Sequence, residues 1–453
     1  MKNRSDLPTI VIGGGPIGLA AAAELVQRDQ PVLVLESGPH PAAAVRSWGH
    51  VRLFSPWSEL ISPAAETLLT GTDWTAPPAQ DYPTGHEWAD HYLDPLAKAL
   101  GDRVRYGQRV VGVAKHDRDL LVDGGRDDQS FVVIASSEHG TSRIEAKAVI
   151  DASGTTGSPN PLAADGYPAM GEEDLRSHLR YGTPDPAAER ERYAGRAVAV
   201  VGSGASALTA LIALTPPTPH TGKTADPDPM LHTGRGVRSR VVWVIRRGEV
   251  GGAFGGGSAD ELPRRGALGM TVHAAVDQGL IEVVTGFRIE AVRPSGDGVA
   301  LVSSDGQRLE HLDEVIVTTG YRPDHAFLSE VRLDLDPRLQ APRALAPSID
   351  PNKHSCGSVA PHGFDVLQQE DPGLFLAGMK SYGRASSFLA MVGFEQVRSI
   401  AAAISGDVAA ARAVVLSLPD TGVCGGAGLF DSALSLSTVT SDKTSVSAGC
   451  CAP

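Results

Sequence analysis

The sequence predicts an α/β fold with parallel sheets, because a strand, a glycine-rich turn and a helix follow one another at two separate places. The first place is residues 9–28 and the second is residues 197–214. Two further strand-like runs, at 148–151 and 315–318, close on turns of small residues on either side of the second place. A chain of 453 residues has room for two or three domains of roughly 150 residues each.

The first glycine-rich turn has the residues and spacing of a dinucleotide-binding fingerprint. Strand 9–12 leads into Gly13, Gly15 and Gly18, and a second strand, 32–35, ends on Glu36. The first glycine permits the tight turn, the second lets a pyrophosphate approach the backbone, and the third lets helix and strand pack closely. An acid after the second strand accepts a ribose hydroxyl, which favours an unphosphorylated ribose, as in FAD or NAD. The predicted cofactor residues of this turn are Gly13, Gly15, Pro16, Ile17, Gly18, Glu36 and Ser37.

The second turn repeats the pattern with a different end to its second strand. Ala207 replaces the third glycine, and strand 241–245 ends on Arg246 and Arg247 instead of an acid. Two guanidinium groups suit a 2′-phosphate, so this turn predicts NADPH, with a solvated arginine pair as the alternative. Segment 215–236, rich in Pro, Thr, Gly and His, is predicted as a surface insertion. The predicted cofactor residues are Gly202, Ser203, Gly204, Ala205, Ser206, Arg246 and Arg247.

Two nucleotide sites in one chain imply internal electron transfer, with a permanently held flavin and a diffusible hydride donor. Together with the small-residue turns at 148–155 and 315–323 and the strand that ends at Gly378, this order resembles the two-dinucleotide-binding-domain flavoproteins, specifically the flavin-containing monooxygenase group. The resemblance covers about residues 8–412. It implies two Rossmann-like domains: an FAD domain from 1–160 and 311–412, an inserted NADPH domain at 161–310, and a flexible tail at 413–453. It further implies cofactor contacts at Ala152, Gly154, Thr319, Gly320, Gly378 and Met379.

The same resemblance suggests residues at the reactive end of the flavin. Trp48 stands where that group has a tryptophan against the flavin, and His50 and Arg52 follow in the segment that lines the ring. His50 and Arg52 are the predicted catalytic residues, with ordinary packing or surface roles as the alternative. Two family signatures are altered: the monooxygenase linker motif is incomplete, and the usual Gly-Asp pair is Gly378-Met379. Backbone amides at these two residues could hold the flavin instead.

A narrower resemblance is to the flavin-binding monooxygenases of bacterial arsenic-resistance gene clusters. It depends on four stretches, 354–357, 378–384, 393–398 and 418–424. It implies trivalent arsenic or antimony as the substrate.

The four cysteines are Cys356, Cys424, Cys450 and Cys451. The last two resemble the carboxy-terminal pair of mercuric reductases, which passes a soft metal ion inward. Thiolates select soft, thiophilic ions, so trivalent metalloids are candidate ligands, with Cys356 and Cys424 as receiving residues. The alternative is that the sequence of the C-terminal tail has drifted and that its cysteines have no function.

No C-x-x-C motif occurs in the sequence, so no paired dithiol is expected beside the flavin to take its electrons. Oxygen is therefore the expected oxidant, and the prediction is an FAD- and NADPH-dependent monooxygenase acting on a small soft nucleophile. Two alternatives stay open: a disulfide or metalloid reductase that uses Cys450 and Cys451, and a flavin-bearing metalloid-binding protein.

Charge and hydropathy exclude other classes of partner. The 40 basic and 53 acidic residues give a net charge of −13, which argues against nucleic acid and anionic membranes. No run of 18 apolar residues occurs, so no membrane span is expected. Four cysteines cannot build a disulfide scaffold, and we therefore expect a cytoplasmic protein with reduced thiols.

Overall fold

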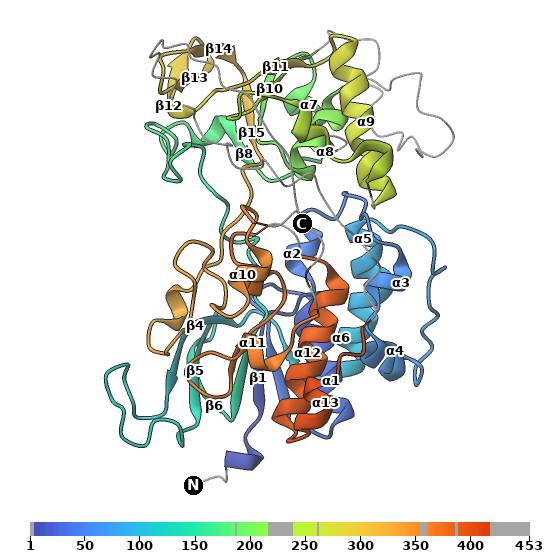
Figure 1. Ribbon diagram of the computed structural model, residues 1–453, viewed down its shortest axis with the longest axis vertical. Helices are drawn as coiled ribbons and strands as arrows, with labels where there is room; N and C mark the ends of the chain where they lie inside the picture. Colours follow the sequence, from blue (N-terminus) through green and yellow to red (C-terminus); the bar gives the residue numbers. More distant parts are fainter. Residues whose placement is uncertain are drawn as a thin grey trace, which may run out of the picture.

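The computed structural model describes residues 4–185, 188–215, 239–260, 262–353, 359, 361–385 and 388–416. These residues form two halves, each built on a five-stranded parallel sheet (Figure 1). The predicted α/β class with two Rossmann-like sheets is confirmed. Within the described residues, no helix has both the length and the apolar character needed to cross a membrane.

The first sheet has the strand order β16-β7-β1-β2-β3. Its strands are β1 (Thr9–Ile12), β2 (Val32–Leu35), β3 (Val104–Arg105), β7 (Ala148–Asp151) and β16 (Leu374–Leu376). An antiparallel sheet of β4 (Arg109–Lys115), β5 (Phe131–Ser137) and β6 (Gly140–Ala146) covers one face. Because β16 pairs with β7 across more than 200 intervening residues, the first half is discontinuous in sequence.

Helices cover the other face of the first sheet. They are α1 (Pro16–Gln27), α2 (Ala43–Arg46), α3 (Trp57–Leu60), α4 (Pro63–Leu69), α5 (Gly85–Trp88), α6 (Asp94–Leu100), α10 (Ala346–Ile349), α11 (Phe364–Leu367), α12 (Ala390–Ile404) and α13 (Val408–Arg412). A π-helical stretch, Ala89–Leu93, joins α5 to α6.

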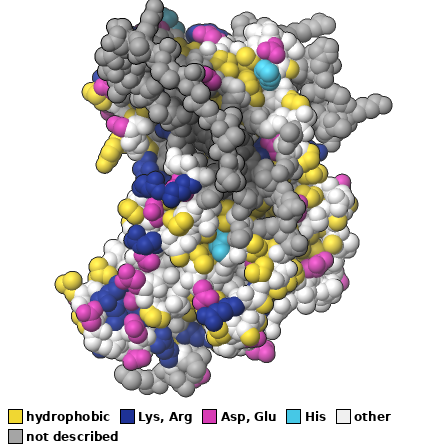
Figure 2. Space-filling view, viewed as in Figure 1, with side chains coloured by type: hydrophobic (Ala, Val, Ile, Leu, Met, Phe, Trp, Pro, Cys, Tyr) yellow, Lys and Arg dark blue, Asp and Glu magenta, His cyan; other side chains and the backbone are white. Residues whose placement is uncertain are grey.

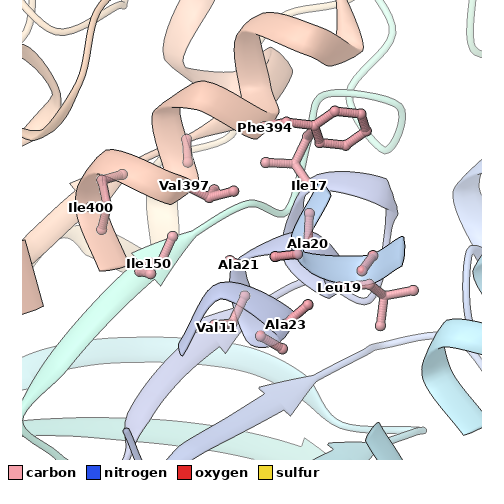
Figure 3. Packing of buried hydrophobic residues seen from close by; sticks show 14 of the residues in the cluster. Val11, Ile17, Leu19, Ala20, Ala21, Ala23, Ile150, Phe394, Val397 and Ile400 are labelled. Carbon is pink, nitrogen blue, oxygen red and sulfur yellow. The ribbon is translucent and has the colours of Figure 1, made fainter. Parts of the chain in front are cut away.

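The centre of this core is the contact between α1 and α12 (Figure 3). The alanines of α1, Ala20 to Ala23, are fully buried and small enough for another helix to lie close. Ile17 packs against Phe394, and at Gly393 a Cβ atom would come within 2.4 Å of Ile17 Cδ1. This packing fixes the start of α1, and with it the first glycine-rich turn, relative to the carboxyl end of β16.

The second sheet has the order β11-β10-β9-β15-β8. Its strands are β8 (Leu179–Tyr181), β9 (Ala197–Val201), β10 (Arg240–Val244), β11 (Glu282–Val284) and β15 (Glu314–Val317). Three helices pack with this sheet: α7 (Arg190–Tyr193), α8 (Ala205–Leu214) and α9 (Pro263–Asp277). An antiparallel sheet of β12 (Ile289–Ser295), β13 (Gly298–Ser303) and β14 (Arg308–Leu312) completes this half.

The strand pairing bears on where the halves divide. β15 pairs with β9 and β8 and so belongs to the second sheet, although the predicted boundary at residue 310 would assign it to the first half. β15 lies between β9 and β8 in the second sheet, and the chain returns to β16 of the first sheet only after it. We propose a boundary after Val317. Most of the predicted insertion at 215–236 and the whole stretch from 417 onward lie outside the described residues.

Candidate functional site: a cavity between two dinucleotide-binding turns

A cavity of about 1520 Å³ lies where the carboxyl ends of the two parallel sheets face each other. Residues from both glycine-rich turns line it. So do the small-residue segments after β7 and β15 and the segment 155–166 that crosses between the halves. Ligands of open α/β sheets bind at this end of the strands. The cavity is therefore the candidate site for both nucleotides.

Nearly all of the predicted nucleotide-binding residues line this cavity. They are Gly13, Gly15, Pro16, Ile17, Glu36, Ser37, Trp48, Ala152, Gly154, Gly202, Ser203, Gly204, Ala205, Ser206, Arg246, Arg247, Thr319, Gly320, Gly378 and Met379. Gly18 is the exception. It is the third residue of α1, where a Cβ atom would stand 1.9 Å from Gly13 O, so its role is close packing.

The first turn has the shape that a bound pyrophosphate requires. Gly13 has a φ of +102°, and a Cβ atom there would stand 2.8 Å from Ala152 O. Gly15 is the N-cap of α1, and Pro16 is its first residue, so the unpaired N–H groups of the first turn face the cavity. No atom lies within 4 Å of a Cβ built on Gly15. A phosphate can therefore approach the backbone at this residue without steric hindrance.

The carboxylate of Glu36, which is predicted to accept a hydrogen bond from a ribose hydroxyl, is fixed at the edge of the cavity. Its side chain is buried, and its two carboxylate oxygens accept from the backbone N–H groups of Gly14 and Gly38, each at 2.6 Å. These two bonds fix the carboxylate beside the first turn. The arrangement fits the adenosine half of FAD.

The second turn repeats this geometry. Gly202 has a φ of +132°, its carbonyl accepts from Trp243 Nε1 at 2.7 Å, and a Cβ atom there would stand 2.4 Å from Thr318 O. Gly204 is the N-cap of α8 and, like Gly15, has open space where a Cβ would lie. Arg246 and Arg247 follow β10 and line the cavity, where they can meet a 2′-phosphate. The residues fit NADPH.

The two predicted catalytic residues do not line the cavity. Arg52 donates to Tyr82 O at 2.5 Å and lies 3.6 Å from Glu87 Oε2, so its guanidinium is engaged within the first half. His50 lies close to the carbonyl of Pro184 and the carboxylate of Asp185, and burial lowers its pKa. Their neighbours Val51 and Leu53 do line it, so the predicted segment reaches the cavity through other residues than the two predicted ones.

One predicted cofactor contact is already satisfied within the chain. The backbone N–H of Gly378 donates to Gln396 Oε1 at 2.8 Å, and Gln396 Nε2 donates to Ser381 Oγ at 2.9 Å. In this structure the amide of Gly378 is thus engaged by Gln396, and a contact between Gly378, which lines the cavity, and the flavin stays a prediction. Gln396 of helix α12 therefore fixes the turn after β16. Met379, the next residue of that turn, is 36% exposed and lines the cavity.

Several polar residues at this site were not predicted from the sequence. Lys380 and Asp151 form a fully buried ion pair beneath the cavity, and Lys380 Nζ also donates to Ser153 Oγ at 3.2 Å. Burial and the charge of Lys380 lower the pKa of the nearby His325. The only sequence signal was the position of Asp151 at a strand end.

Cys356, Cys424, Cys450 and Cys451, the predicted metalloid ligands, lie outside the described residues. Within the described parts of the chain, no group of three His, Cys, Asp or Glu side chains could hold a metal ion.

Comparison with known proteins agrees with this geometry. Residues 10–218, a little under half of the chain, match the model of the family described as pyridine nucleotide-disulphide oxidoreductase. The matched segment contains the first turn, β7 and the second turn. The chain is a flavin-dependent oxidoreductase. The predicted cofactors, FAD and NADPH, agree with this class of enzyme, and the assignment of FAD to the first turn and NADPH to the second stays a prediction.

Solved structures share the fold at low sequence identity. The bacillithiol disulfide reductase Bdr (YpdA) from Bacillus cereus has a TM-score of 0.62 and 22% identity, over 88% of this chain and 99% of that one. A doubly substituted flavin monooxygenase from Stenotrophomonas maltophilia has a TM-score of 0.56 and 21% identity, over 88% and 98%. DfoA, a cadaverine monooxygenase from Erwinia amylovora bound to FAD, has a TM-score of 0.57 and 13% identity, over 92% and 99%. No curated protein matches the sequence.

Proposed function

We propose that this protein is an NADPH-dependent FAD monooxygenase that transfers one oxygen atom to a soft nucleophile, and that trivalent arsenic or antimony is its substrate. The observation that carries the proposal is that both dinucleotide-binding turns face one cavity. A nicotinamide and a flavin held by these turns can meet there without a second protein. Bound FAD would supply the redox chemistry, taking a hydride equivalent from NADPH and reacting with O2.

The residues of the chain bind and orient the reactants. The N-termini of α1 and α8 hold the two pyrophosphates, Glu36 holds a ribose, and Arg246 and Arg247 select the phosphorylated nucleotide. Trp48 supplies an apolar wall, since its ring lies over Gly85 and lines the cavity. Apolar walls exclude water from the reaction.

The cysteine spacing in the sequence favours oxygen over a protein disulfide as oxidant, because no C-x-x-C motif occurs. A reductase of the dithiol type needs a thiol pair beside the flavin. For arsenite the balanced reaction converts arsenous acid, O2, NADPH and one proton to arsenic acid, NADP+ and water. One oxygen atom of O2 forms the new bond to arsenic, and the other leaves as water.

Trivalent arsenic or antimony is proposed from the narrower resemblance and from the soft thiolates at Cys450 and Cys451, which can deliver a thiophilic ion. We place the protein in the cytoplasm, where these thiols stay reduced.

A second candidate is an NADPH-dependent disulfide or metalloid reductase. The likeness in fold to the bacillithiol disulfide reductases and the name of the matching family favour it. In this case Cys450 and Cys451 would have to supply the missing thiol pair. A third candidate is a metalloid binder that carries flavin without turnover.

Consumption of NADPH by the FAD-loaded full chain distinguishes the three candidate functions. The assay is run with and without O2, with and without arsenite or methylarsenite, on the wild type and on a Cys450→Ser/Cys451→Ser variant. The monooxygenase predicts O2-dependent consumption that the arsenical stimulates, pentavalent arsenic as product, and turnover retained in the serine variant at saturating substrate. Substrate-dependent consumption without O2 that the serine variant loses would establish the reductase. Binding of the arsenical without turnover would establish the binder.

A further inference from the structure

Two arginines reach the cavity from segments that follow different sheets. Arg322 follows β15, the last strand of the second sheet along the chain, and Arg384 follows the turn Gly378–Tyr382, which comes after β16 of the first sheet; both line the cavity. Arg322 is fixed in place because its Nε donates to Asn160 Oδ1 at 2.8 Å and its Nη2 to Gly166 O at 2.9 Å. Arg384 Nε donates to Gln340 Oε1 at 3.0 Å.

Neither guanidinium is neutralised by a carboxylate among the described residues. Arg338, which lines the same cavity, differs from them because it forms an ion pair with Asp350 at 2.8 Å. The pKa of Arg322 is lowered by burial and by the positive charge of Arg384. Gln340 connects the two segments, because its side chain accepts from Arg384 Nε at 3.0 Å and its backbone carbonyl lies 3.2 Å from Nε2 of His325, three residues after Arg322. An anion bound beside both guanidinium groups would be attracted by both charges.

The acids that line the cavity near these arginines have other partners. Asp165 Oδ1 accepts from the backbone N–H of Tyr167 at 3.0 Å, and Asp324 Oδ1 accepts from that of Ala326 at 2.9 Å. Lys and Arg side chains also gather at the left of the narrow region between the halves (Figure 2). The cavity wall therefore carries both basic and acidic side chains at this place.

The strand orders place the two arginines away from the adenosine ends of both nucleotides. In the first sheet Glu36 follows β2, on one side of β1, while Arg384 follows β16, on the other side. In the second sheet Arg247 follows β10, on one side of β9, while Arg322 follows β15, on the other side. A dinucleotide extends across the sheet from its ribose-binding residue. The arginines therefore lie on the side of the cavity toward which the flavin and nicotinamide ends extend.

We propose that Arg322 and Arg384 form an anion subsite that binds an oxyanion or carboxylate group of the substrate or product. This inference rests on the proposed function, because it assigns substrate chemistry to the same cavity. Guanidinium groups recognise such anions through paired N–H donors. Arsenite is uncharged at neutral pH and arsenate is an anion. The subsite therefore binds an inorganic product more tightly than its substrate and favours organic substrates that carry their own negative charge.

The test is calorimetric titration of inorganic phosphate into the FAD-loaded full chain, with and without saturating NADP+. We expect phosphate binding that persists in the presence of NADP+ and weakens at least tenfold in Arg384→Gln and in Arg322→Gln. Arg384→Lys keeps the charge and should restore part of the affinity. The matched control is Arg343→Gln, because Arg343 is exposed, pairs with Asp334 and does not line the cavity. It should bind phosphate like the wild type.

Three results would overturn the subsite: no phosphate binding by the wild type, equal binding by wild type and Arg384→Gln, or competition between phosphate and NADP+. The last result would assign the arginines to the nucleotide phosphates. Arg384 is exposed, so its substitution leaves the fold intact and the test valid even if Arg322→Gln misfolds. Phosphate binding is measured without turnover. A failure of the monooxygenase proposal would therefore show in the NADPH assay and leave this result unchanged.

Discussion

Lys380 Nζ lies 2.5 Å from Asp151 Oδ2, and both side chains are fully buried. Asp151 ends β7, and Lys380 lies just beyond the neighbouring strand β16, so the pair joins the carboxyl ends of two adjacent strands. The other oxygen of Asp151 accepts from the N–H and the hydroxyl of Ser153, which lines the cavity. The ion pair thus holds Ser153 in place at the wall of the cavity.

Removing one partner of this pair should be strongly destabilising. Lys380→Met leaves the Asp151 carboxylate buried without its counter-charge, and we expect a loss of about 3 to 5 kcal/mol in the free energy of unfolding. The double variant Lys380→Met/Asp151→Asn should recover much of that loss, since it removes both charges. Urea unfolding of the three proteins measures both effects. A single variant within about 1 kcal/mol of the wild type would contradict the pair's structural role.

The first turn allows cofactor binding to be separated from folding. Gly15→Ala places a methyl group in open space, so the apo-protein should keep its stability while FAD affinity falls at least tenfold. Gly18→Ala is the contrast, because its methyl group would collide with Gly13 O and should destabilise the apo-protein itself. FAD titration followed by flavin fluorescence, with thermal unfolding of each apo-protein, reads the two effects. Unchanged FAD affinity in Gly15→Ala would show that no phosphate approaches there.

Nucleotide preference should depend on the two arginines after β10. Replacing Arg246 and Arg247 together with glutamine removes the positive charges that suit a 2′-phosphate. We expect KM for NADPH to rise at least tenfold while KM for NADH changes less than twofold. Steady-state flavin reduction with each nucleotide measures this. An equal loss for both nucleotides would indicate that these side chains contact a part common to the two.

The free energy of unfolding at alkaline pH should depend on the ionisation of Lys115. This side chain is 2% exposed, its Nζ lies 3.8 Å from the centre of the Phe131 ring, and burial lowers its pKa to about 8. The unfolded chain, with a lysine pKa near 10.4, binds more protons between pH 8 and 10, so the folded state gains stability as the pH rises. We expect a gain of about 2 kcal/mol that is absent in Lys115→Met.

The readout for Lys115 is the difference between wild type and variant in urea unfolding at pH 7.5, 8.5 and 9.5. Buried tyrosines such as Tyr92, whose pKa burial raises to about 12, act in the opposite direction above pH 10 and cancel in that difference. Parallel pH profiles for the two proteins would refute the prediction.

Local sequence signals were sufficient for the fold class and for most of the cavity lining. A turn such as Gly13 to Gly18 is specified by residues a few positions apart, since each glycine meets a local steric demand. The second turn and the segments after β7 and β15 were found in the same way. Residues of all these segments, among them Gly15 and Gly320, line one cavity, because each segment follows the carboxyl end of a strand.

Only the tertiary structure decided which distant side chains meet. Lys380 and Asp151 are 229 positions apart, and Arg322 and Arg384 lie in segments that follow strands of different sheets, so no spacing along the chain predicts either relationship. His50 and Arg52 lie in the expected segment, yet they interact with Tyr82, Glu87 and Pro184 and do not line the cavity. The sequence by itself determined the two sheets and their phosphate-binding turns, because these obey short-range backbone sterics. The charges around the cavity depend on packing between strands and helices that the chain brings together only when it folds.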